Sequence, residues 1–359
     1  MAEASGPLVG LRVVEFVSIG PGPHCAMLLS DQGADVVRID RPGGNGWPNP
    51  IMDRGRTVMT LDIRSDEGRD RAIALCDTAD VLIEGFRPGV MERLGLGPDV
   101  LCGRNDRLVY GRMTGWGQDG PLAQTAGHDI NYIAMTGALA AMGHAGERSP
   151  PPLNLVGDFG GGSMFLAFGI MAALWERERS GRGQVVDAAI VDGVSNLMTM
   201  FTGLTPSGRI SLHRDRNPLA GAAPYYRTYM CADGRQIAVG AIEPQFWAQL
   251  LTTLGIACDR PSDLQREAAW PETTRLLEAA FASQPCAHWT ALFHGTDACV
   301  YPVLTTQEAL HDPHLQARGT FVDQHGIPHT APAPRFSRTP GAIQDGRTAD
   351  PTKTLWSTA

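Results

Sequence analysis

The chain has 359 residues, of which 43% are hydrophobic and 19% are charged, so it is long and apolar enough for a folded globular protein of two domains. Its net charge of −8 and its lack of a basic cluster argue against a nucleic-acid partner. Seven cysteines without a repeated spacing indicate reduced thiols and a cytoplasmic location, and the uncharged run Phe159–Trp175 predicts a buried core helix rather than a membrane span.

The first forty residues have the pattern of a strand, a helix and a second strand, over Leu11–Phe16, Pro23–Gln32 and Ala34–Ile39. This order predicts an α/β fold with a large Rossmann-like domain built on a parallel sheet. The turn Gly20-Pro21-Gly22 also resembles part of a dinucleotide-binding fingerprint, but Cys25 stands where that fingerprint needs its third glycine. A nicotinamide cofactor is therefore not expected.

The middle of the chain carries two candidate proton carriers. A glycine-rich loop, Arg112–Pro121, leads to His128, and Asp158 lies just before the glycines Gly160–Gly162. Histidine titrates near neutrality, and burial beside Phe159 would raise the pKa of the Asp158 carboxyl, so the two groups suit acid/base catalysis. Two plainer interpretations stay open, in which Asp158 is a helix N-cap and His128 is a structural or surface residue.

The second half of the chain predicts a smaller α+β domain. A strand that runs into a helix is expected over Val185–Gly193, and a polar connection over Pro206–Arg216. A hairpin over Tyr225–Ala241 and helices near Phe246–Leu254 and Thr273–Ala282 follow. We expect a large domain over residues 1–200, a linker over 201–224, the small domain over 225–315, and a segment over 316–359 that returns to the large domain.

Residue usage disfavours several kinds of bound cofactor. The only lysine, Lys353, lies near the C-terminus, where it is a poor Schiff-base partner for pyridoxal phosphate. The cysteines show no metal-binding spacing, and the turn Asp312-Pro313 separates His311 from His314. We therefore expect no metal site and no cofactor.

Several segments together resemble the α-methylacyl-CoA racemases of the family III CoA-transferase superfamily, and the similarity extends over most of the chain. It is carried by the segments around His128 and Asp158 and by Gly10–Glu15, Gly20–His24, Gly33–Pro42, Phe86–Gly89, Arg112–Gln118 and Val239–Gln245. The resemblance implies the family III CoA-transferase fold. It also implies an intertwined homodimer, with each active site between the large domain of one subunit and the small domain of the other.

The resemblance further implies an isomerase of lipid and fatty acid metabolism. Such an enzyme racemizes 2-methylacyl-CoA thioesters at C2 by a 1,1-proton transfer through an enolate, with CoA as part of the substrate. The positions that match the acid/base pair are His128 and Asp158, and Glu243 matches the residue that supports the histidine. The expected substrate-binding residues, with arginines for the CoA phosphates, are Arg38, Arg54, Arg56, Arg87, Gly22 and Tyr226.

Two other functions stay open at this stage. One is CoA transfer with Asp129 as the nucleophile, because the aspartate of related transferases matches this position. The other is a non-catalytic acyl-CoA-binding protein, against which the intact set of His128, Asp158 and Glu243 argues. Met198 and Met200 could adapt to varied acyl groups, or could simply pack in the core.

Overall fold

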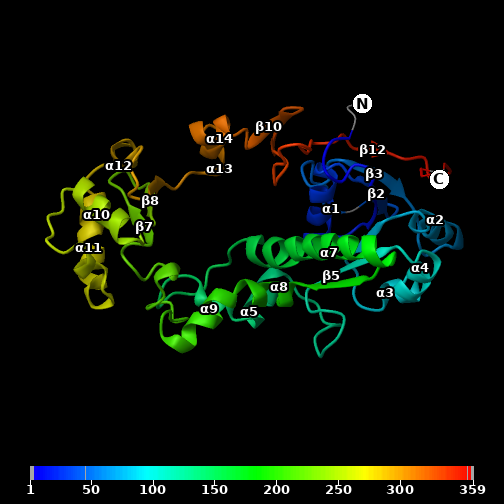
Figure 1. Cartoon of the computed structure of the whole chain (residues 1–359), viewed down its shortest axis with the longest axis horizontal. Coiled ribbons are helices and arrows are strands. Elements are labelled where there is room, and N and C mark those ends of the chain that lie inside the picture. Colours follow the sequence, from blue (N-terminus) through cyan, green and yellow to red (C-terminus); the bar gives the residue numbers. More distant parts are fainter. Residues whose placement is uncertain (1–3, 45, 354, 357–359) are drawn as a thin grey trace. The chain divides into compact units, whose positions relative to one another are not determined.

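The computed structural model describes residues 4–44, 46–353 and 355–356, and the chain divides into two compact units (Figure 1). Unit 1 comprises the described parts of residues 1–136, 152–197 and 316–359, and unit 2 comprises residues 137–151 and 198–315. This division differs from the predicted domain limits in two places: residues 198–224, which include the predicted linker, belong to unit 2, and so does the segment 137–151. That segment follows the first site segment in sequence but packs with unit 2.

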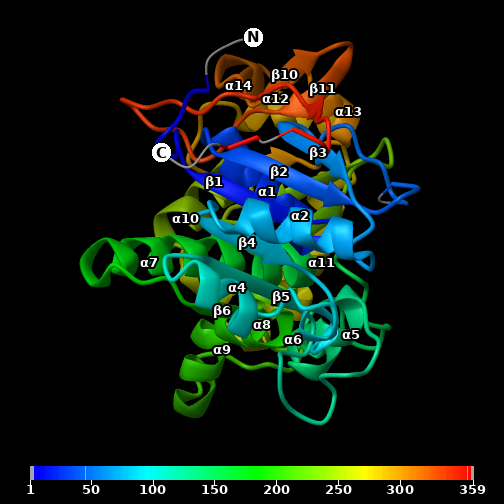
Figure 2. The ribbon, with the colours of Figure 1, turned by 90° about the vertical axis from the view of Figure 1, so that its right-hand side faces the viewer.

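Unit 1 is built around a parallel sheet. Among the described residues, seven strands lie in the order β12-β3-β2-β1-β4-β5-β6, and every neighbouring pair is parallel (Figure 2). In chain order the strands are β1 (Arg12–Phe16), β2 (Asp35–Asp40), β3 (Arg56–Thr60), β4 (Val81–Glu84), β5 (Val109–Thr114), β6 (Val185–Ala189) and β12 (Arg347–Thr348). The strand order reverses between β1 and β4, and open α/β sheets bind ligands at the carboxyl ends of strands at such a reversal.

The predicted strand, helix and strand at the N-terminus are confirmed as β1, α1 (Pro21–Asp31) and β2. Each strand has a pair of adjacent valines, which is expected where both faces of a parallel sheet are covered. Val13, Val14, Val36 and Val37 are accordingly buried. Helix α1 begins two residues earlier than predicted, because Pro21 fits the first helical position, where no N–H is needed.

The other helices of unit 1 connect the strands. The Ser65 hydroxyl caps the first of them, α2, by accepting a hydrogen bond from the Gly68 N–H at 3.1 Å. Their bounds are α2 (Asp66–Cys76), α3 (Val90–Arg93), α4 (Pro98–Arg104), α5 (Asp129–Met135), the π-helix η1 (Leu155–Ser163), α7 (Met164–Ser180) and α8 (Ile190–Leu197). A hairpin of β10 (Phe321–Gln324) and β11 (Ile327–Thr330) follows α14 (Pro313–Ala317) near the end of the chain.

Unit 2 contains an antiparallel sheet and its own apolar core. The sheet has β7 (Arg227–Met230), β8 (Gln236–Val239) and β9 (Val300–Pro302), and the β7-β8 pair confirms the predicted hairpin. Trp247, Trp289 and Tyr229 are the largest members of the core. The helices are α6 (Ala138–Ala141), α9 (Thr199–Leu204), α10 (Pro244–Thr253), α11 (Trp270–Phe281), α12 (Cys286–Phe293) and α13 (Thr306–Ala309).

The helix of η1 and α7 together is long and apolar enough to cross a membrane, although the core helix of a soluble protein meets the same criterion. It runs beside β5 in unit 1 (Figure 1). Only one face of α7 is buried, through Leu166, Ile170 and Leu174. The predicted core helix is therefore buried on one face and exposed on the other. The helix has an exposed apolar stripe, formed by Met164, Phe168, Met171 and Trp175.

Candidate active site

A cavity of 430 Å³ opens in unit 1 where the strand order reverses. Its wall includes the turn after β1, the loop after β4 and the end of β5. It brings together four of the predicted site residues, which are Gly22, Arg87, His128 and Asp158. The two residues predicted to form the acid/base pair thus line one cavity, at the place where such sheets bind ligands.

His128 occupies the N-cap position of α5 and is exposed. Its backbone N–H donates to the Asn131 side-chain oxygen at 3.0 Å, which sets the start of the helix. The Tyr132 hydroxyl donates to the Gly127 carbonyl at 2.5 Å, and its ring meets Trp116 edge-on with 4.7 Å between ring centroids. Sequence reasoning missed Tyr132 and Trp116. Their aromatic rings fix the segment just before His128 and line the same cavity.

Asp158 lies within the first turn of the π-helix η1, so the N-cap interpretation is wrong. Asn154 occupies the N-cap position, and its side-chain NH₂ donates to Asp158 Oδ2 at 3.4 Å. Short π-helical segments occur frequently at functional sites, because the wider turn re-aims the side chains. Burial, followed by the negative charge of Asp129, raises the pKa of the Asp158 carboxyl.

The Asp129 carboxylate is turned toward the backbone that carries Asp158. Its Oδ2 atom accepts a hydrogen bond from the Asp158 N–H at 2.7 Å. A Cβ added to Gly157 would clash with that same oxygen, so the close approach requires glycine. Asp129 is absent from the described residues that line the 430 Å³ cavity.

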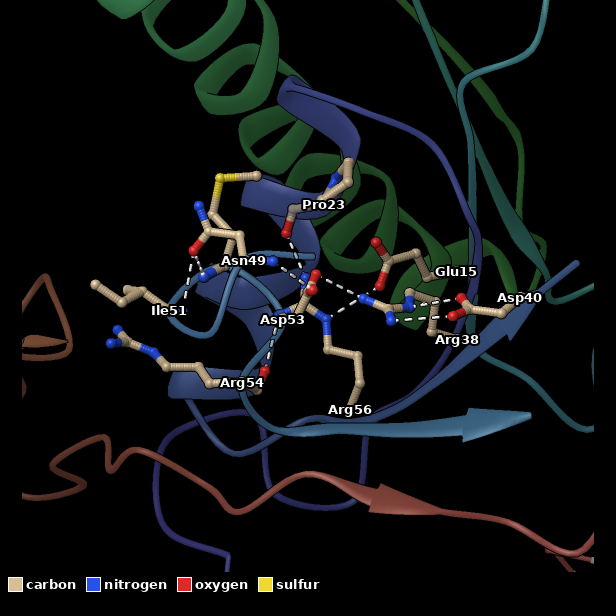
Figure 3. Close-up of polar contacts among 10 residues, drawn as sticks. Glu15, Pro23, Arg38, Asp40, Asn49, Ile51, Asp53, Arg54 and Arg56 are labelled. Atoms are coloured by element: carbon tan, nitrogen blue, oxygen red, sulfur yellow. Dashed lines mark hydrogen bonds and ion pairs between the residues drawn. The ribbon is translucent and has the colours of Figure 1, made fainter. Parts of the chain in front are cut away.

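Three of the four predicted CoA-binding arginines are buried in ion pairs inside unit 1 (Figure 3). Arg38 pairs with Asp40 and Asp53, each at 2.7 Å. Arg54 binds Asp31 at 2.5 Å and Arg56 binds Glu15 at 3.0 Å. Arg56 also donates to the carbonyls of Arg54 and Pro23, so all three of its nitrogens are engaged. Only Arg87 of the predicted set is exposed.

A second cavity, of 760 Å³, lies beside the first and was not predicted. Its wall includes the exposed residues Arg41, Arg64 and Arg93, from segments that follow β2, β3 and β4. None of the ion pairs within the described residues engages these three guanidinium groups. Ser18, Ile19, Gly85 and Phe86 line both cavities. The two cavities therefore meet along the carboxyl ends of β1 and β4.

The two remaining predicted residues belong to unit 2. Glu243 is the N-cap residue of α10, where its backbone carbonyl accepts a hydrogen bond from the Trp247 N–H at 3.0 Å. Tyr226 lies just before β7 and is partly exposed. His128 and Asp158 therefore belong to unit 1, whereas Glu243 and Tyr226 belong to unit 2.

A parallel α/β sheet with a cavity at its strand-order reversal, lined by a histidine and a partly buried aspartate, is typical of enzymes that act on small molecules. The family model for CoA-transferase family III matches residues 8–352, and the chain belongs to that family. It is 46% identical to the alpha-methylacyl-CoA racemase of Mus musculus over 93% of this chain and 87% of that protein. It is 43% identical to the Homo sapiens protein of the same name, over 93% and 90% of the two chains.

The fold is likewise shared with solved members of the family. A CAIB/BAIF family protein from Brucella suis superposes with a TM-score of 0.82 at 28% sequence identity, covering 96% of each chain. Both parts of the predicted fold class, the parallel α/β sheet and the family III CoA-transferase fold, are thereby confirmed.

Proposed function

We propose that the protein racemizes 2-methylacyl-CoA thioesters at C2 by a 1,1-proton transfer through an enolate. The observation that carries this function is that His128 and Asp158 line one cavity. The similarity to the two mammalian racemases supports the same reaction. Inversion at carbon needs one group to remove a proton and a second group to return one from the opposite face, and this pair supplies both.

The two groups exchange roles according to the enantiomer that enters. With one enantiomer, neutral His128 removes the C2 proton and protonated Asp158 delivers a proton to the other face. With the other enantiomer, the Asp158 carboxylate is the base and imidazolium is the acid. The raised pKa of Asp158 suits this exchange, because the carboxyl must hold a proton for half of the cycle. Backbone N–H groups around Asp129 stabilise the enolate oxygen.

The CoA part of the substrate occupies the second cavity in this proposal. Arg41, Arg64 and Arg93 provide cationic groups for the phosphates, since planar guanidinium groups bind phosphate oxygens in pairs. The pantetheine arm then passes over Ser18 and Phe86, which belong to both cavities. The side chains of the protein carry out each proton transfer, so the reaction requires no cofactor.

A homodimer completes the site in this proposal. The apolar stripe of α7 exposes 74% of Phe168 and 69% of Trp175, and a second copy of the chain would cover it. The partner's small domain would then bring its Glu243 toward His128, as the resemblance implies. We place the enzyme in the cytoplasm and in fatty acid metabolism. All seven cysteines are free thiols, which fits a reducing compartment.

The test follows one enantiomer of a 2-methylacyl-CoA in D₂O with no metal, nucleotide or acceptor acid added. Loss of optical purity together with deuterium at C2 is the expected result. Retained configuration without deuterium, combined with CoA transfer once a free acid is added, would replace the proposal by family III CoA transfer. The His128→Ala protein is the control, since it should retain CoA binding and lose exchange.

A further inference from the structure

We infer that Asp129 is a positioning residue for Asp158 and not a nucleophile. The inference rests on the proposed racemase function and assigns a role to a carboxylate that acid/base chemistry at C2 does not itself use. It also distinguishes this chain from a transferase with a catalytic aspartate at the same position.

The contacts of Asp129 join two elements of the site. Asp129 is the first residue of α5, directly after His128, while Asp158 lies in η1. The 2.7 Å hydrogen bond from the Asp158 N–H to Asp129 Oδ2 ties the backbone of one catalytic residue to the neighbour of the other. The fit against Gly157 leaves no room for a side chain between the two segments. The relative position of His128 and Asp158 therefore depends on this carboxylate.

The same contacts keep Asp129 from acting as a nucleophile. A carboxylate that attacks a thioester carbonyl must bring a free oxygen lone pair to the carbonyl carbon. Oδ2 is bound to the Asp158 N–H and faces Gly157. Oδ1 is shielded from solvent and has no hydrogen-bond partner among the described residues. Acylation of Oδ2 would break its hydrogen bond to the Asp158 N–H, and acylation of Oδ1 would require the atoms that cover it to move.

The position of Asp129 also has an electrostatic consequence for its neighbour. The groups that act on the Asp158 carboxyl are Asp129, whose charge raises its pKa, and Asn154 and His128, which lower it. On the remaining side, Gly20 contributes no charge, and Tyr132 is neutral with a raised pKa of its own. Removal of the Asp129 charge should therefore lower the pKa of Asp158.

Two substitutions separate the positioning role from a purely structural one. Asp129→Asn keeps an oxygen that accepts the Asp158 N–H but removes the charge. We expect kcat within about fivefold of the parent protein, with the acid limb of the pH profile moved to lower pH. Asp129→Ala removes the hydrogen bond as well, and we expect kcat to fall about 10- to 100-fold while KM changes little. Asp119→Asn, an exposed carboxylate in the preceding loop, is the matched control.

The outcomes are distinguishable from failure of the proposed function. If the parent protein does not racemize the substrate, the proposed function is wrong, whatever the variants do. If the parent is active and Asp129→Ala keeps full activity, or Asp129→Asn leaves the pH profile in place, the positioning role is refuted. If the parent protein formed an acyl-enzyme that hydroxylamine cleaves, and Asp129→Asn formed none, Asp129 would be a nucleophile.

Discussion

The Asp158 carboxylate lies against Gly20, so that a Cβ on this glycine would stand 3.0 Å from Asp158 Oδ2. Gly20 has a φ of 71° and a ψ of −118°, a backbone conformation that side-chain-bearing residues rarely adopt. The turn that ends β1 and begins α1 thus has two reasons to require glycine. One is its own conformation, and the other is the Asp158 side chain that it faces.

Gly20→Ala should lower both stability and activity. The strained backbone is expected to cost about 1–3 kcal/mol of unfolding free energy. The added methyl group should also displace Asp158 and reduce kcat at least about tenfold. Gly10→Ala is the control, because Gly10 also has a positive φ but no atom near its Cβ position. Calorimetry and steady-state kinetics on both variants would show a stability loss in each, and a loss of kcat in the folded Gly20 variant alone.

Asp158→Asn is expected to abolish racemization without destabilising the protein at neutral pH. Because the pKa of Asp158 is raised in the folded state, the native protein binds a proton that the unfolded chain releases. Ionisation of Asp158 therefore reduces stability as the pH rises from about 4 through the raised pKa. The amide cannot ionise, so denaturation at pH 7 should give an equal or higher unfolding free energy. A decrease of more than about 1 kcal/mol would contradict this account.

Arg112 should be much more important for stability than a surface arginine. It donates to Glu84 at 3.0 Å and to Glu92 at 2.8 Å, and Glu84 also accepts the Phe86 N–H in the loop that both cavities share. Arg112→Ala leaves the buried Glu84 carboxylate without its cation, which should cost about 3–5 kcal/mol. Arg104→Ala, which breaks an exposed pair with Asp77, should cost much less, because solvent screens an exposed ion pair. Equal losses in urea denaturation would be evidence against the burial argument.

The arginines of the second cavity and the buried arginines should respond differently to substitution. Arg93→Ala is expected to raise KM for the CoA thioester about tenfold and to leave the melting temperature unchanged, because the side chain is exposed and lines the 760 Å³ cavity. Arg56→Ala should instead lower the melting temperature, because it leaves the buried Glu15 carboxylate without its cationic partner. Kinetics and thermal unfolding on both proteins provide the check. If Arg56→Ala raised KM and Arg93→Ala lowered only the melting temperature, the buried arginines would be the phosphate-binding residues.

The stripe on α7 gives a prediction about assembly. Phe168→Asp places a charge in the surface that a second copy would bury, so light scattering should detect monomers where the parent protein forms dimers. Activity should fall when the dimer dissociates, because in the proposed dimer the partner's Glu243 lies close to His128. Glu178→Ala, at the polar end of the same helix, should leave the mass unchanged. A parent protein that is monomeric and fully active would exclude this arrangement.

The sequence predicted the sheet better than it predicted the site. The valine pairs Val13-Val14 and Val36-Val37, separated by a helical segment, indicate two buried parallel strands, so β1, α1 and β2 were predictable. Phosphate-binding and internal arginines have no such local signature. Arg38, at a strand end, meets Asp53 from a later loop, and only the folded chain shows that pair. The π-helix around Asp158 was missed for a similar reason, because a glycine run after an aspartate also fits an ordinary helix start.

Ser18, Ile19, Gly85 and Phe86 form the shared wall of the two cavities. With CoA placed as proposed, this wall would couple recognition at one end of the substrate to reactivity at the other. The attraction between the nucleotide and its arginines can thereby hold C2 between the acid and the base, although neither phosphate nor adenine reacts. Thioesters that lack the nucleotide should consequently turn over slowly even at saturating concentration. The fixed length of the arm between phosphate and sulfur would then set the position of the acyl group. Distance as well as acidity would therefore determine which carbon loses its proton.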